Sequence, residues 1–327
     1  MMKKTMKNKS ISLLVLTFLL LLQGCFRINS GEDTTSKATP KKSTFQKEIF
    51  KLNSVEDLYR FLTYDENCYP IISAHRGGAV KGYPENAIES FANIADHMPA
   101  IIECDVRLSK DSVMVLMHDE NIDRSTNGTG AINDYTIHEL KQFRLKDSER
   151  NLTDYQIPTL EEALAWGAGK VIFTLDIKKG VSYQKMAELI GKTNAQAYSV
   201  IITYSANQAI ALHRIAPELM ISVSIKSEKD LQRLYNAGIP DNRLVAFVGT
   251  RQPDRQLVEA IHSHGIKIIL GTLGNLDRQA DSKGYQTYAE FIENGADIIS
   301  TDRPFEAFKA LDFYVRKRGI SSPFINQ

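Results

Sequence analysis

The sequence predicts an α/β fold in which eight strand–helix units close into a (β/α)8 barrel. Short apolar runs of strand length recur along the chain, and runs of helical length separate them. This alternation favours parallel strands joined by helical crossovers. The chain has 327 residues, which is enough for one large barrel. A doubly wound open sheet built from the same units is the alternative.

Charge is almost balanced along the chain. Lysine and arginine number 40, aspartate and glutamate number 39, and the formal net charge is +1. Without a basic surplus the composition gives no support for a nucleic-acid partner. No tandem repeat or heptad run is apparent, and we predict no protein partner.

The N-terminal segment has the features of a secretory signal rather than of a folded domain. Basic residues precede an apolar stretch from Ile11 to Leu22, which is short for a membrane span. The residues Leu22-Gln23-Gly24-Cys25 resemble a bacterial lipobox, which implies cleavage before Cys25 and lipidation of its thiol. An ordinary signal with a chance cysteine is the alternative.

Three segments follow from this interpretation. Residues 1–24 are expected to be a signal peptide, residues 25–45 a lipidated tether rich in Ser, Thr and Lys, and residues 46–327 the barrel. The protein is then an exported bacterial lipoprotein, anchored in a membrane and facing the periplasm or the cell surface.

The first two predicted strands carry residues that could take part in catalysis or metal binding. The apolar run Ile71–Ala74 leads into His75 and Arg76, and the glycines that follow allow a sharp turn with its backbone open to a ligand. The next strand, residues 101–106, contains Glu103 and Asp105. Side chains two apart on a strand share a face, and such hard oxygen ligands suit Ca²⁺ or Mg²⁺. We therefore predict a divalent-cation site here.

A third strand, residues 113–117, follows too closely for a parallel crossover, so a β-hairpin is expected. With Lys110–Asp111 as a two-residue turn, His118 would lie opposite Glu103. Asp105, Leu116 and His118 would then share one face with it. Since histidine titrates near neutral pH, two histidines beside a cation suit phosphate-ester chemistry.

The remaining elements alternate after a small insertion. The insertion runs from Asp119 to Tyr155 and includes a short helix at 136–143. Thr159 and Glu162 form a capping-box pattern that opens a helix to Trp166. Further strands are expected at 171–177, 200–204, 220–225, 244–248, 266–270 and 297–300, and helices at 183–193, 206–215, 228–237, 254–264 and 285–294.

Polar residues fall where several of these strands end, which is where barrels place their active sites. Asp176 and Lys178 again lie two apart, and Asp302 follows the last strand. Two residues remain open: Tyr204 either lines the pocket or is a core or rim aromatic, and Glu85 either caps a helix entered at Asn86 or contacts the site.

Two cysteines lie inside the predicted barrel. Cys68 precedes the first strand by several residues, whereas Cys104 lies near the level of His75 on the neighbouring strand. Their separation exceeds what a disulfide spans. We expect two free, buried thiols, with Cys104 facing away from Glu103 toward the covering helices.

These residues resemble the glycerophosphodiester phosphodiesterase family, within the wider phosphatidylinositol-phospholipase-C-like barrels. The resemblance runs from about Ile71 to Pro304. It rests on an ordered set of motifs: His75-Arg76-Gly77, Pro84-Glu85-Asn86, Glu103-x-Asp105-Val106, Val115-x-x-His118-Asp119, Asp123-Arg124-Ser125-Thr126, Ile157-Pro158-Thr159-Leu160-Glu161 and the segment from Asp297 to Pro304.

The resemblance implies divalent-metal hydrolysis of a glycerophosphodiester to a phosphomonoester, sn-glycerol 3-phosphate, and an alcohol. It implies that His75 and His118 are the acid–base pair. Metal ligands carried over by position are Glu103, Asp105 and Asp176, and phosphate-binding cations are Arg76 and Lys178.

Two departures from the family pattern bear on the chemistry. Asp176 stands where the family usually has the glutamate of a Glu-x-Lys motif, and it is one methylene shorter. The family's Trp-Thr-x-Asn segment corresponds here to residues 270–275, which lack the tryptophan, so the alcohol pocket should differ. A cyclising lyase and a non-catalytic substrate-binding lipoprotein are the alternative functions.

Overall fold

The computed structural model describes residues 48–326. The predicted signal peptide, Cys25 and the tether lie outside the described residues. Among the helices that the structure describes, none combines the length and the apolar character needed to cross a membrane.

Eight parallel strands form the predicted barrel. Both β9 and β2 pair with β1, so the sheet closes on itself and the open-sheet alternative is wrong. The barrel strands are β1 (Ile71–Ala74), β2 (Ala100–Leu108), β4 (Ile172–Ile177), β5 (Ser199–Thr203), β6 (Met220–Ser224), β7 (Leu244–Phe247), β8 (Lys267–Gly271) and β9 (Ile298–Thr301).

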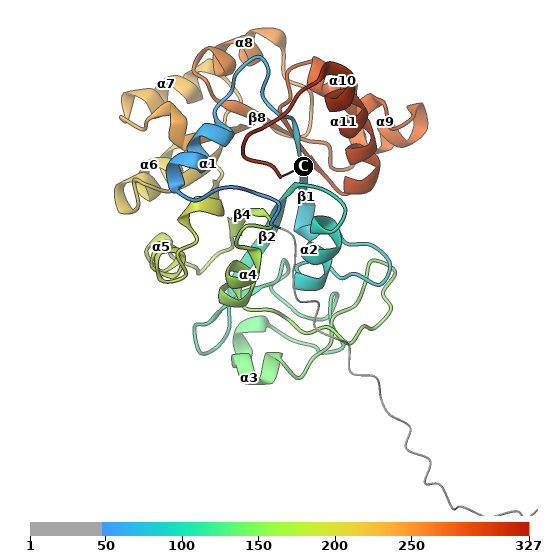
Figure 1. Cartoon of the computed structure of the whole chain (residues 1–327). Helices are drawn as coiled ribbons and strands as arrows, with labels where there is room; N and C mark the ends of the chain where they lie inside the picture. The colour runs from blue at the N-terminus through green and yellow to red at the C-terminus, as the bar shows by residue number, and fades with distance from the viewer. Residues whose placement is uncertain (1–47, 327) are drawn as a thin grey trace, which may run out of the picture. The chain divides into compact units, whose positions relative to one another are not determined.

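Helices surround the strands in a ring (Figure 1). Four of those that follow barrel strands are capped by side chains: Ser182, Ser205, Ser227 and Asp254 each accept the N–H three residues on. The helices are α1 (Val55–Leu62), α2 (Ile88–Ala95), α3 (Ile137–Leu140), α4 (Leu160–Gly167), α5 (Tyr183–Lys192), α6 (Ala206–Ile215), α7 (Glu228–Asn236), α8 (Arg255–Ser263), α9 (Asn275–Lys283), α10 (Thr287–Glu293) and α11 (Pro304–Arg318), with short 3₁₀ turns at His75–Gly77, Ile132–Asp134, Gln196–Tyr198 and Asp241–Arg243.

Alternation along the strands creates two apolar layers. On β2, Ile102 and Cys104 pack outward among the covering helices, whereas Ile101 points into the barrel. The barrel interior is apolar at the amino ends of the strands, where Phe61 and Leu62 of α1 pack against it. Since Glu103 shares the inward face with Ile101, the functional side chains lie above an apolar floor that excludes water.

Both cysteines are free thiols, and Cys104 faces away from Glu103 as expected. The expectation of burial is wrong for Cys68, which is partly exposed. Its thiol lies at the edge of a surface pocket and donates to Asp297 Oδ1 at 3.4 Å.

The predicted hairpin is present, but its register is shifted by one residue. Strand β3 (Met114–Leu116) pairs antiparallel with β2, and Leu116 lies opposite Val106 rather than Asp105. The cause is a longer loop, in which Ser112 adopts φ 63° and Ser109 bonds to Val113. Leu116 therefore faces the helical layer, and His118 lies beyond the strand end rather than opposite Glu103.

The turn after β1 requires glycine at position 77. Gly77 has φ +81°, and a Cβ there would lie 2.2 Å from Phe91 Cε1. Gly82, in the same loop, has φ +78° but no atom within 4 Å of such a Cβ. Both positions carry a left-handed cost of about 1–2 kcal/mol for alanine, but only Gly77 adds overpacking of about 1–3 kcal/mol.

Gly77→Ala is therefore expected to lower the free energy of unfolding by about 1–3 kcal/mol more than Gly82→Ala does. Urea unfolding of the two variants measures this difference. Equal losses would show that Phe91 yields without cost and that packing does not fix this turn.

Candidate active site

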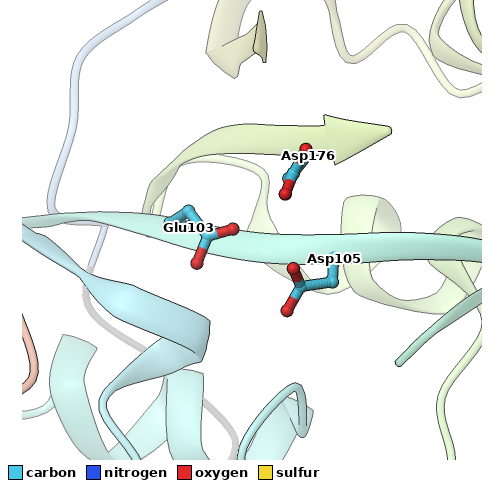
Figure 2. Close-up of side chains that lie close together, drawn as sticks. All are labelled: Glu103, Asp105 and Asp176. Atoms are coloured by element: carbon cyan, nitrogen blue, oxygen red, sulfur yellow. The ribbon is translucent and has the colours of Figure 1, made fainter. Parts of the chain in front are cut away.

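Three buried carboxylates meet at the carboxyl ends of two neighbouring strands (Figure 2). Glu103 and Asp105 project from the inward face of β2, and Asp176 comes from β4, where it is the register partner of Asp105. Each offers an oxygen within 4.8 Å of the others. The structure thus brings together all three residues that the sequence suggested as metal ligands.

Excess negative charge marks this cluster. Burial and the charge of Asp105 raise the pKa of Glu103 to about 8. Burial would also raise the pKa of Asp105, but Lys178 and Asn86 outweigh it and hold that pKa below its usual value. Asp176 Oδ1 is buried with no hydrogen-bond partner among the described residues. An unmatched carboxylate oxygen in a crowded acidic cluster fits a hard divalent cation.

Lys178 lies between two of the carboxylates. Its Nζ is 2.7 Å from Asp105 Oδ1 and 2.6 Å from Asp176 Oδ2. Arg76 Nε also lies 3.8 Å from Asp105 Oδ2, so two side-chain cations face three carboxylates and offset only part of their repulsion. The shorter side chain of Asp176 reaches the cluster all the same.

Each candidate catalytic histidine is fixed by an aspartate at Nδ1. His75 Nδ1 lies 2.6 Å from Asp302 Oδ1, and His118 Nδ1 lies 2.7 Å from Asp119 Oδ1. A carboxylate accepts from N–H, so Nδ1 carries the hydrogen and Nε2 is free for proton transfer. His75 Nε2 lies 4.0 Å from Glu103 Oε2.

The environment favours a protonated His75. Burial disfavours the charged imidazole, but the hydrogen bond to Asp302 and the charge of Glu103 outweigh this effect, so the pKa of His75 is raised. His118 reaches the site because Met117 N donates to Asp105 O at 2.9 Å, which holds the departing chain beside β2.

Arg76 is positioned by its own backbone as well as its side chain. The backbone of Arg76 adopts a left-handed conformation with φ 51°, and its N–H donates to Glu103 Oε2 at 2.7 Å. Arg76 Nη1 lies 3.3 Å from Glu85 Oε2, whereas the buried Nε has no hydrogen-bond partner among the described residues. An unmatched guanidinium N–H beside the cluster suits a phosphate oxygen.

Glu85 is a site contact and not a helix cap. It accepts from Arg76 and from Arg124 Nη1, the latter at 2.8 Å, and α2 has Ala87 as its N-cap without a side-chain cap. Arg124 also pairs with Asp119, so a chain of charges connects Arg76 to His118.

Sequence reasoning missed the partners that hold the predicted site in place. Asn86 Nδ2 donates to Asp105 Oδ2 at 2.8 Å, and Asn86 Oδ1 accepts from the backbone of Asp105 at 2.9 Å. Asp119 holds His118, and Arg124 in turn pairs with Asp119. Their signal was their place inside the matched motifs, next to residues that received roles.

Tyr204 serves both roles that the sequence left open. Its hydroxyl donates to Asp176 Oδ2 at 2.7 Å, while 59% of the residue remains exposed at the rim. A cavity of about 140 Å³ opens beside it between the acidic cluster, Phe247 and Leu273. Leu273 belongs to the segment that lacks tryptophan, so this departure lies on the pocket wall.

Comparison with known proteins shows which protein family the chain matches. Residues 75–306 match the model of the glycerophosphoryl diester phosphodiesterase family. A glycerophosphodiester phosphodiesterase of Caldanaerobacter subterraneus is 29% identical over 267 residues, covering 76% of this chain and 99% of that protein.

Solved structures agree on the fold. A glycerophosphoryl diester phosphodiesterase from Parabacteroides distasonis has a TM-score of 0.77 and 37% identity, covering 85% of this chain and 99% of its own. An Oleispira antarctica phosphodiesterase, solved with the product sn-glycerol-3-phosphate, has a TM-score of 0.59 at 23% identity and covers 78% of this chain and 99% of its own.

A closed (β/α)8 barrel with this family match defines an enzyme, a phosphoric diester hydrolase. The chain belongs to the glycerophosphoryl diester phosphodiesterase family. The resemblance seen in its motifs is confirmed.

Proposed function

We propose that this protein hydrolyses glycerophosphodiesters to sn-glycerol 3-phosphate and an alcohol, with a divalent cation, Ca²⁺ or Mg²⁺, held by Glu103, Asp105 and Asp176. The observation that carries this proposal is the pairing of two aspartate-fixed histidines with one cluster of three buried carboxylates. Proton transfer and anion stabilisation are the two needs of phosphodiester hydrolysis.

The histidines share the proton transfers. One Nε2 takes a proton from the attacking water as its oxygen bonds to phosphorus. The other Nε2 gives a proton to the alcohol oxygen as the phosphorus–oxygen ester bond breaks. Asp302 and Asp119 hold the two rings in the required tautomer and stabilise each imidazolium when it forms.

Fixed cations of the protein stabilise the negative charge on the phosphate. The buried Nε of Arg76 and the ammonium of Lys178 are protein cations beside the carboxylates. They would bind non-bridging oxygens, whose negative charge grows as five-coordinate phosphorus forms. A bound divalent cation supplies further stabilisation of that charge and orients the phosphate.

A substrate panel tests the proposed activity. The full chain is assayed with glycerophosphocholine, glycerophosphoethanolamine, glycerophosphoinositol and glycerophosphoglycerol, with Ca²⁺ or Mg²⁺ added after chelation. A coupled dehydrogenase assay reports sn-glycerol 3-phosphate. Release of this product from at least one substrate is expected, and failure with all of them would remove the glycerophosphodiester assignment.

We further propose that the protein is an exported lipoprotein anchored through Cys25. The lipobox-like residues before Cys25 and the basic and apolar stretch preceding them support this proposal. Two or three acyl chains on one cysteine give firm anchoring, because each buried methylene contributes about 0.8 kcal/mol.

Cys25→Ser is expected to move the protein from the membrane fraction to the soluble fraction. Fractionation followed by immunoblotting measures the change, and Cys68→Ser is the control because it replaces a cysteine far from the predicted cleavage site. If the Cys25→Ser protein still fractionates with membranes, the lipid anchor is not what holds it there.

A further inference from the structure

A second cavity, of about 330 Å³, lies beside the carboxyl end of β2 and is separate from the pocket at Tyr204. Three basic side chains line it, from Arg107, Lys110 and Lys179, together with the carboxylate of Glu120. We refer to it as the basic cavity. Its walls come from the end of β2, the hairpin loop and the segment after β4.

The basic cavity adjoins the active site directly. Arg107 lies two residues beyond Asp105 on the same face of β2, about 7 Å further along the strand. Arg107 Nε donates to the backbone carbonyl of His118 at 2.9 Å. Lys179 follows Lys178, whose backbone N–H is bonded to β2 at Val106.

The cations of this cavity outnumber the carboxylates that line it. In residues 48–326, Arg107, Lys110 and Lys179 form no ion pair within 4.0 Å, whereas Lys178 next to them pairs twice. Glu139 is not part of the cavity lining, although its charge attracts Lys110. Its carboxylate accepts hydrogen bonds from the backbone N–H and the hydroxyl of Thr136. Three cations against one carboxylate leave a concave site with a net positive charge, which attracts anions.

Phosphate is the anion that the arrangement suits. The single hydrogen bond of the Arg107 side chain uses Nε, which leaves the N–H groups of both terminal nitrogens for a forked contact with phosphate oxygens. The two lysines add mobile positive charge at the opening. Because Arg107 lies only two residues beyond Asp105 on β2, one substrate molecule is long enough to reach both the acidic cluster and this cavity.

We propose that the basic cavity binds a second phosphate, carried on the alcohol part of the substrate, so that the alcohol extends toward the hairpin loop and not into the pocket at Leu273. The preferred substrate is then a glycerophosphodiester whose alcohol is itself phosphorylated. This inference rests on the proposed function, because it assumes that the phosphodiester lies at the acidic cluster.

Three substrates that differ only in phosphate number test the proposal: glycerophosphoinositol, its 4-phosphate and its 4,5-bisphosphate. For the full chain, kcat/KM is expected to be about tenfold higher for the phosphorylated substrates. The double variant Lys110→Gln/Lys179→Gln should lose this preference while its kcat/KM for glycerophosphoinositol stays unchanged.

A matched control is the double variant Lys185→Gln/Lys229→Gln, which removes two exposed lysines of α5 and α7 outside the cavity. It should keep the preference. Equal kcat/KM for the three substrates in the unmodified protein would overturn the proposal, and so would equal loss of preference in both double variants. If none of the three substrates were cleaved while other glycerophosphodiesters were, the basic cavity proposal alone would fail; failure with every glycerophosphodiester would instead refute the proposed function.

Discussion

Alanine at His75 or at His118 is expected to lower kcat for a glycerophosphodiester by about 10²–10⁴-fold. Each imidazole has Nδ1 fixed by an aspartate and presents Nε2 for proton transfer. The alkoxide of a natural alcohol is a poor leaving group, so loss of the acid and loss of the base should both be severe.

Loss of the two histidines should have different effects on kcat for a substrate with a good leaving group. A nitrophenyl phosphodiester needs no proton on its departing oxygen, so the histidine that acts as the acid becomes nearly dispensable for it. The other histidine stays necessary because water must still lose a proton. Steady-state kcat for both variants on both substrates assigns the roles.

His138→Ala is the control for these variants, because His138 is an exposed histidine of α3 with no role in the site. It should retain the kcat of the unmodified protein. If His75→Ala and His118→Ala both keep near-normal kcat on glycerophosphodiesters, the acid–base assignment is wrong.

The second large effect concerns the acidic cluster. Glu103→Gln is expected to reduce kcat/KM by about 10²-fold or more, and chelation should abolish turnover of the unmodified protein until Ca²⁺ or Mg²⁺ is restored. Glutamine keeps the shape of Glu103 but removes the charge that a hard cation requires.

A thermal shift gives a readout that does not depend on turnover. Added cation should raise Tm of the chelated protein, because a ligand that binds only the folded state stabilises it. Glu103→Gln should show a smaller rise, whereas Glu188→Gln, at an exposed position of α5, should match the unmodified protein. An unchanged cation-induced rise in Glu103→Gln would exclude Glu103 as a ligand.

The barrel could be predicted because its strands are short, apolar and regularly spaced. Strand β1 and helix α6 have the bounds that the sequence indicated. Helix α9 was missed because it is largely polar and buries little beyond Asp277 and Ala280, which leaves no apolar periodicity. Helix α1 was missed because it precedes the first strand and belongs to no strand–helix unit.

The hairpin register shows where local inference failed. A two-residue turn was assumed, but Ser112 takes up the left-handed conformation without a glycine to signal it. The hydrogen-bond partners of the histidines could not be predicted for another reason. Asp302 is 227 residues from His75 in sequence, and only closure of the barrel through β1 and β9 brings the two together.

The most direct test of the account follows the phosphorus through one reaction. Chelated protein is mixed with a glycerophosphodiester in ¹⁸O-labelled water, and ³¹P NMR is recorded before and after Ca²⁺ or Mg²⁺ is added. The account predicts no reaction before addition, and afterwards sn-glycerol 3-phosphate with one ¹⁸O on its phosphorus. Full turnover before cation is added, or a cyclic phosphate as the final product, would contradict it.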